Sequence, residues 1–198
     1  MSLAPAPVAV SGPAVAAPRA AVIVTAVGCA ALTARPLLLD LAGGHPAPVI
    51  AALFVVLLGV SVRWPANGTR PAAGPVLGAL PVLALGVGAF AAGRLLLAGS
   101  PPPASATAFV VGLNTLAAVA EEAFFRRLVY GALLAGGAGL AVIGSAVLFA
   151  AVHVTVYGLW VLPLDLAAGL LFGWQRQATG SWTVPAATHA VANVLVVV

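Results

Sequence analysis

Residues 105–134 read SATAFVVGLNTLAAVAEEAFFRRLVYGALL, an apolar stretch whose middle holds two adjacent acids, Glu121 and Glu122. The chain has only four acidic residues in 198, so half of its negative charge lies at this point. A charged side chain inside a lipid-spanning helix costs about 2.5–3.5 kcal/mol on insertion scales. A chain that keeps two carboxylates there is expected to use them.

The overall composition indicates that most of this chain is surrounded by the lipid bilayer rather than by water. Hydrophobic residues make up 63% and charged residues 6%, and the mean hydropathy is +1.17, whereas about a quarter of the residues in soluble domains are charged. We therefore expect an integral membrane protein in contact with the lipid bilayer. The net charge of +4 comes from eight arginines and no lysine. This density is too low for a nucleic-acid-binding surface, and no nucleic-acid partner is expected.

Seven apolar runs predict the architecture. A helix needs about 20 apolar residues to cross the hydrocarbon core, and polar residues, Gly or Pro separate runs at 20–39, 48–62, 76–98, 105–134, 140–157, 159–174 and 182–198. The predicted fold class is all-α, a polytopic transmembrane bundle of about seven helices with a polar intramembrane site. Residues 1–18, rich in Pro and Ala, are predicted to be a flexible tail, and residues 19–198 a single transmembrane domain.

The arginines predict an orientation in the membrane. The stretches that follow the first, third and fifth apolar runs carry no arginine; the flanking arginines are Arg19, Arg63, Arg70, Arg126, Arg127 and Arg176. With seven spans, the positive-inside rule predicts a cytoplasmic N-terminus, and the residue usage favours a bacterial plasma membrane. Arg35 and Arg94 lie inside apolar runs, and their guanidinium groups are expected to extend to an interface.

The two glutamates are predicted to have different partners. Glu122 and Arg126 are four residues apart with the acid first, which favours a salt bridge on one face of a helix. Glu121 has no partner at that spacing, so its side chain is expected to face a cavity. The alternative is that both acids lie at a helix end among lipid headgroups, close to the two arginines.

Three further polar side chains lie in later apolar runs. His153 shares a helix face with Phe149, and His189 shares one with Asn193, because each pair is four residues apart. Taken singly, His153 is more often a hydrogen-bonded packing residue, and His189 with Asn193 an interhelical hydrogen-bond pair. Asp165 has no cation at helical spacing, and the sequence does not assign it a role.

Taken together, these residues are the components of a hydrolytic site. A carboxylate in an apolar setting can accept a proton from water, and a His/Asn pair can donate hydrogen bonds to a developing oxyanion. The same carboxylate and histidines could instead bind a divalent metal. Other enzyme patterns are absent from the sequence, which contains no HExxH, no GxSxG and no phosphate-binding GxxxxGK loop.

Three motifs in this order resemble the CPBP family of intramembrane proteases, which includes the type II CAAX prenyl endopeptidases and bacterial Abi-like proteins. The EExxxR motif is present as Glu121–Arg126, the FxxxH motif as Phe149–His153 and the HxxxN motif as His189–Asn193. The resemblance covers about residues 105–198, the expected protease-like core.

The resemblance implies an all-helical membrane endopeptidase. In such a site Glu121 would activate water with the help of His153, whereas His189 and Asn193 would hold the oxyanion. Glu122 and Arg126 would support the site. A mechanism without metal is favoured; if a divalent metal such as zinc is present, Glu121, His153 and His189 would bind it.

The expected partner is a membrane-associated protein or peptide substrate. A non-catalytic membrane protein, acting in bacteriocin immunity or in partner binding, is the alternative function. A proton-coupled transporter with a titrating glutamate is a third possibility, although transporter folds are often built from repeats and this sequence has no evident repeat.

Overall fold

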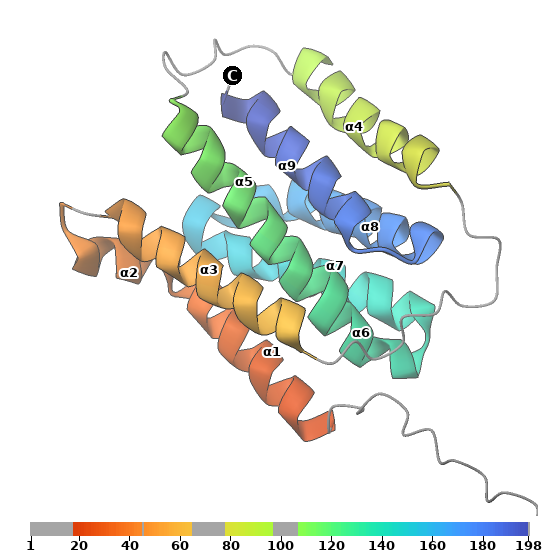
Figure 1. Ribbon diagram of the computed structural model, residues 1–198, viewed down its shortest axis with the longest axis horizontal. Helices are drawn as coiled ribbons and strands as arrows, with labels where there is room; N and C mark the ends of the chain where they lie inside the picture. The colour runs from red at the N-terminus through yellow and green to blue at the C-terminus, as the bar shows by residue number, and fades with distance from the viewer. Residues whose placement is uncertain (1–17, 45, 65–77, 97–106, 198) are drawn as a thin grey trace, which may run out of the picture.

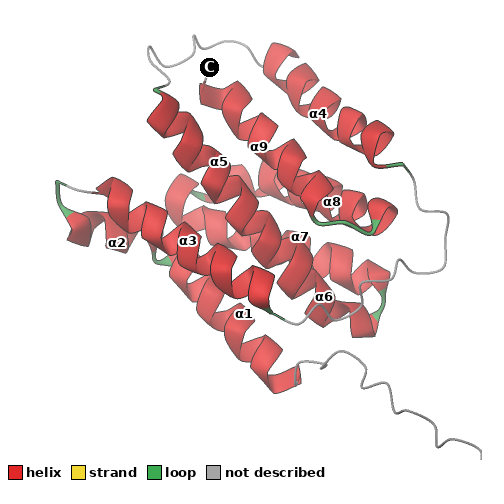
Figure 2. Ribbon diagram, in the orientation of Figure 1, coloured by secondary structure: helices red, strands yellow, loops and turns green. Residues whose placement is uncertain are grey.

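The computed structural model describes residues 18–44, 46–64, 78–96 and 107–197, and every regular element in these ranges is a helix (Figure 2). Nearly all of the predicted N-terminal tail, residues 1–18, lies outside the described residues; only Pro18 is included, as the first residue of α1. The α-helices are α1 (Pro18–Thr33), α2 (Arg35–Ala42), α3 (Pro46–Arg63), α4 (Ala79–Leu96), α5 (Ala108–Glu122), α6 (Tyr130–Leu133), α7 (Ala138–Tyr157), α8 (Leu162–Thr179) and α9 (Thr183–Val197). The prediction of an all-α helical bundle is confirmed.

The stretch around the glutamate pair forms one continuous helix of 29 residues, Ala108–Gly136. Thr107 caps its start, because the Thr107 side chain accepts a hydrogen bond from the Val110 amide. Directly after the glutamates the helix widens into a π-helical segment, Ala123–Val129, and Tyr130 N donates five residues back to Phe125 O. Such π segments occur frequently at functional sites. The helix ends at Gly136 and is followed by Gly137, whose φ of 102° suits a residue without a side chain.

The helix that carries the glutamates lies in the middle of the bundle. α5 packs against α3 on one side and α9 on the other, and α4 covers the outer side of α9 (Figure 1). α7 packs against α1 and α8. α9 contacts α5 and α8, α8 contacts α7, and α7 contacts the segment Ala123–Val129 that continues α5, so the four helices surround a common interior.

α7 and α8 approach closely because α8 carries glycines on the shared face. A Cβ atom at Gly169 would lie 3.0–3.1 Å from atoms of Ala146, and one at Gly173 would lie 3.1 Å from Val142. Small residues at such contacts let membrane helices pack backbone to backbone. The close packing holds Asp165 and Phe172 of α8 near the α7 face that carries His153.

In the part of the chain that the structure describes, four helices are long and apolar enough to cross a membrane, namely Pro46–Arg63, Ala79–Leu96, Ala108–Gly136 and Ala138–Tyr157. α1 and α2 form a fifth candidate as a pair bent by 52°. Within the described residues α8 and α9 do not reach the same length and apolarity, since α8 carries charged and amide side chains and α9 has 15 residues. The protein is an integral membrane protein whose two last helices are packed against longer ones.

Candidate active site

A partly open cavity of about 510 Å³ lies between α5, α7, α8 and α9, and residues of α2, α3 and α4 also line it. Most of its wall is apolar. The polar side chains on the wall come from five helices and are Arg35, Asn114, Glu121, His153, Tyr157, Asp165, His189 and Asn193. Four predicted site residues therefore reach one cavity: Glu121, His153, His189 and Asn193.

Helical spacing explains which residues of α5 reach this cavity. Asn114, Ala117 and Glu121 lie three or four residues apart, so they share one face, and all three line the wall. Glu122 points about 100° away from Glu121 around the helix. Glu122 is absent from the cavity wall and is fully buried.

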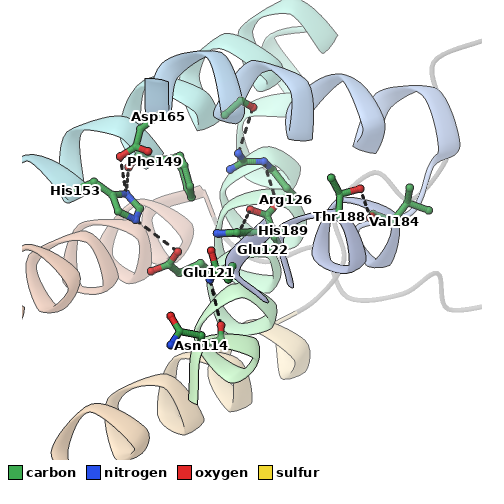
Figure 3. Close-up of polar contacts among 12 residues, drawn as sticks. Asn114, Glu121, Glu122, Arg126, Phe149, His153, Asp165, Val184, Thr188 and His189 are labelled. Carbon is green, nitrogen blue, oxygen red and sulfur yellow. Dashed lines mark hydrogen bonds and ion pairs between the residues drawn. The ribbon is translucent and has the colours of Figure 1, made fainter. Parts of the chain in front are cut away.

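The two oxygens of the Glu121 carboxylate have different neighbours. Oε1 accepts a hydrogen bond from Arg35 Nη1 at 3.1 Å, which is also an ion pair. Oε2 faces His153 Nε2 at 3.7 Å, as Figure 3 shows. The expectation that Arg35 extends to an interface is wrong, because its guanidinium is buried against Glu121 and only 8% of the residue is exposed. Arg35, a partner far away along the chain, explains how a charged Glu121 is accommodated in this interior.

His153 lies between two acids (Figure 3). Its Nδ1 donates to the Phe149 carbonyl at 2.7 Å, which leaves Nε2 as the nitrogen toward Glu121. Asp165, to which no role could be assigned from its spacing, places Oδ2 3.8 Å from the same Nδ1. The ring is also held from the side, since Tyr157 stacks on it with 5.9 Å between centroids. The Phe149–His153 spacing thus positions the imidazole through a backbone bond as well as a shared face.

Glu122 is part of a separate, closed cluster. Its Oε2 lies 3.3 Å from Arg126 Nε, the ion pair expected from their spacing, and its Oε1 accepts a hydrogen bond from His189 Nδ1 at 3.1 Å. Both Glu122 and Arg126 have no exposed surface. Because Nδ1 is engaged, Nε2 is the nitrogen of His189 that remains for a ligand in the cavity.

Arg126 is enclosed by aromatic rings rather than placed in a loop. Its guanidinium carbon lies 5.0 Å from the Phe149 ring centroid, 5.6 Å from that of Phe172 and 5.8 Å from that of Phe125. Nη2 also donates to the Gly169 carbonyl at 3.2 Å. Cation–π contacts of this kind are stronger when desolvated. Arg126 therefore links α5, α7 and α8 behind the cavity wall.

Asn193 is fixed by a backbone group of α5. Its Nδ2 donates to the Asn114 carbonyl at 3.2 Å, and one of the two amide hydrogens remains for another acceptor. The structure thus brings His189 and Asn193, which share a face of α9, to the wall of the same cavity as Glu121 and His153. Sequence reasoning missed Asn114, although its position seven residues before Glu121, two helical turns, could have identified it.

The residues that would bind a metal line the same cavity, namely Glu121, His153 and His189. Among the described residues, no group of three or more His, Cys, Asp or Glu side chains is arranged to hold a metal ion. Both histidines bond to a protein group through Nδ1, His153 to the Phe149 carbonyl and His189 to Glu122.

Comparison with known proteins identifies the segment that carries this site. Residues 103–195 match a family described as type II CAAX prenyl endopeptidase Rce1-like. This range contains the three motifs and the four predicted site residues on the cavity wall, whereas Arg35 lies outside it. No curated protein and no solved structure matches the chain significantly.

Proposed function

We propose that this membrane protein, whose residues 103–195 match the Rce1-like family of type II CAAX prenyl endopeptidases, hydrolyses a peptide bond with water activated by Glu121. The family supports intramembrane protease activity in general. One observation carries the finer proposal: Glu121 lines the cavity with one oxygen bound to Arg35 and the other directed toward His153.

The proposed reaction follows from the positions of these groups. Glu121 takes a proton from a water molecule, and the water oxygen attacks the carbonyl carbon of the scissile bond. His153 Nε2, next to Glu121 Oε2, orients this water. The proton passes to the leaving amine as the carbon–nitrogen bond breaks, so that Glu121 is ionised again at the end of the cycle.

The negative charge of the tetrahedral intermediate needs hydrogen-bond donors. The free amide hydrogen of Asn193 and the imidazole of His189 are proposed to supply them from α9. Glu122 supports this step because it holds His189 through Nδ1 and is itself paired with Arg126. The substrate is proposed to be a membrane-associated protein or peptide, since the cavity wall is mostly apolar.

The location is part of the same proposal. Arg19 at the start of α1 and Arg63 at the end of α3 are exposed, as topology-setting charges are expected to be. We propose that the protein resides in a bacterial plasma membrane with its N-terminus in the cytoplasm. Arg126 and Arg127 add nothing to this argument: Arg126 is buried, and Arg127 donates to the Ser61 and Trp64 carbonyls.

The function is tested with the purified protein in liposomes. Two probes are offered, a farnesylated peptide ending in a CAAX sequence and an unprenylated apolar peptide, each with a fluorophore and a quencher flanking the expected cleavage region. We expect hydrolysis of at least one probe, with the cleaved bond identified by mass spectrometry. Binding without cleavage of either probe would favour the non-catalytic alternative.

Removal of the proposed oxyanion donor should lower turnover. In Asn193→Ala we expect kcat to fall by about 10²–10³-fold with KM nearly unchanged, as for other oxyanion-hole donors, because the lost bond forms mainly in the transition state. Thr183→Ala, an exposed residue of the same helix, is the matched control. A loss confined to KM would contradict the assignment of Asn193.

Chelation distinguishes the metal-free proposal from a metal enzyme. After dialysis against EDTA and treatment with 1,10-phenanthroline, the liposome-bound protein should retain its full rate, because Glu121 and His153 activate the water without a metal ion. Loss of the rate, with recovery on addition of zinc, would show that the metal-free reaction is wrong.

A further inference from the structure

Arg35 is the cation on the wall of the cavity, and it comes from outside the segment that matches the family. It is the first residue of α2, immediately after the 52° bend between α1 and α2. Thr155 of α7 donates to the Thr33 carbonyl at 2.9 Å, so α7 contacts the chain at this bend. The bend directs Arg35 into the bundle, 86 residues before the acid it binds.

The Arg35 guanidinium is held on three sides. Nε donates to the Leu32 carbonyl at 2.9 Å, Nη1 donates to Glu121 Oε1 at 3.1 Å, and the group lies over the Phe54 ring at 6.0 Å from its centroid. These contacts orient the fork of the guanidinium. A lysine would carry the charge but could not make the Nε and Nη1 bonds together.

This orientation has a consequence for Glu121. A glutamate side chain has three rotatable bonds, and a carboxylate without a fixed partner would change rotamer in the cavity. Because Arg35 binds Oε1, Oε2 is the oxygen directed toward His153 Nε2. The base that accepts the proton from water is thereby fixed in one position.

We propose that Arg35 is a positioning residue that completes the active site from the N-terminal helices by holding Glu121 in its reactive orientation. The inference rests on the proposed endopeptidase function. It means that the segment 103–195 carries the reacting groups but lacks the group that orients its base. A misplacement of about 1 Å at a reacting group can lower a rate about 100-fold.

The test compares Arg35→Ala, Arg35→Lys and wild type in liposomes with whichever of the two peptide probes the wild type cleaves. We expect kcat to fall about 10–100-fold in Arg35→Ala with KM within about threefold, since the substrate still binds but the base is misplaced. Arg35→Lys should recover part of kcat, because it restores the charge without the fork. Arg94→Ala is the matched control: Arg94 is a half-buried arginine of α4 that donates to the Leu195 carbonyl, and its removal should leave kcat unchanged.

A double variant separates positioning from a general loss of stability. If Arg35 acts only through Glu121, Arg35→Ala combined with Glu121→Gln should be no slower than Glu121→Gln alone. Wild-type kcat in Arg35→Ala, or an equal loss in Arg94→Ala, would overturn the proposal. If Arg35→Ala does not insert into the membrane, Arg35→Lys tests the proposal in its place. A lower kcat in Arg35→Lys with the thermal midpoint of the wild type would support the positioning role, and a wild-type kcat would overturn it. An inactive wild type would instead overturn the proposed function itself.

Discussion

Replacement of Glu121 by glutamine should reduce peptide hydrolysis by about 10²–10⁴-fold, the usual contribution of a general base. This corresponds to about 3–5 kcal/mol of transition-state stabilisation. The amide keeps the size of the side chain and an oxygen that can still accept from Arg35 Nη1, so the fold should persist. It cannot take a proton from water, and kcat should therefore fall while the probe still binds. The measurement is kcat and KM with a fluorogenic probe in liposomes.

The control for Glu121→Gln is the same change at another acid. Asp40 lies on the exposed side of α2, and Asp40→Asn should leave both kcat and KM at their wild-type values. The thermal midpoint in detergent checks that both variants are folded. A Glu121→Gln protein that hydrolyses the probe at the wild-type rate would exclude Glu121 as the base.

The second large effect is expected on stability. Arg126→Met should lower the free energy of unfolding by about 3–5 kcal/mol, because it leaves the buried Glu122 carboxylate without its cation. Both groups have no exposed surface, and the guanidinium is also enclosed by three aromatic rings. The measurement is the unfolding midpoint in detergent, by thermal or denaturant titration.

Two comparisons test this explanation of the loss. The double variant Glu122→Gln/Arg126→Met should recover most of the stability, since it contains no unpaired buried charge. Arg63→Met, at the exposed end of α3, should change the midpoint little. A double variant as unstable as Arg126→Met alone would mean that the aromatic and Gly169 contacts of Arg126, rather than its charge, stabilise the bundle.

Much of the site could be predicted because helical spacing is a local property. Residues four apart share a helix face whatever the tertiary structure, so the Glu122–Arg126 pair and the common faces of Phe149 with His153 and of His189 with Asn193 follow from the chain itself. The separation of Glu121 from Glu122 follows from the 100° step per residue. In the structure Glu121 lines the cavity and Glu122 does not.

The partners of these residues could not be predicted in the same way. Arg35 was expected at an interface, yet it binds Glu121 from 86 residues away, and Glu122 binds His189 across 67 residues. Such pairs depend on which helices are neighbours and on their axial register. In a bilayer, apolar helix faces do not specify which helices are neighbours, because lipid tails and aliphatic side chains are nearly equivalent surroundings. Small residues such as Gly169 determine the neighbour and the register by allowing close packing.

The sequence by itself therefore determined that the protein lies in a membrane, where its helices are, and on which helix face each polar residue lies. These properties depend on composition and on the 3.6-residue period of the helix. The tertiary structure alone decided that these faces line one cavity and that Arg35, Asn114 and Asp165 also line it. The physical reason is that a buried charge requires a partner, and the partner is fixed by helix packing rather than by spacing along the chain.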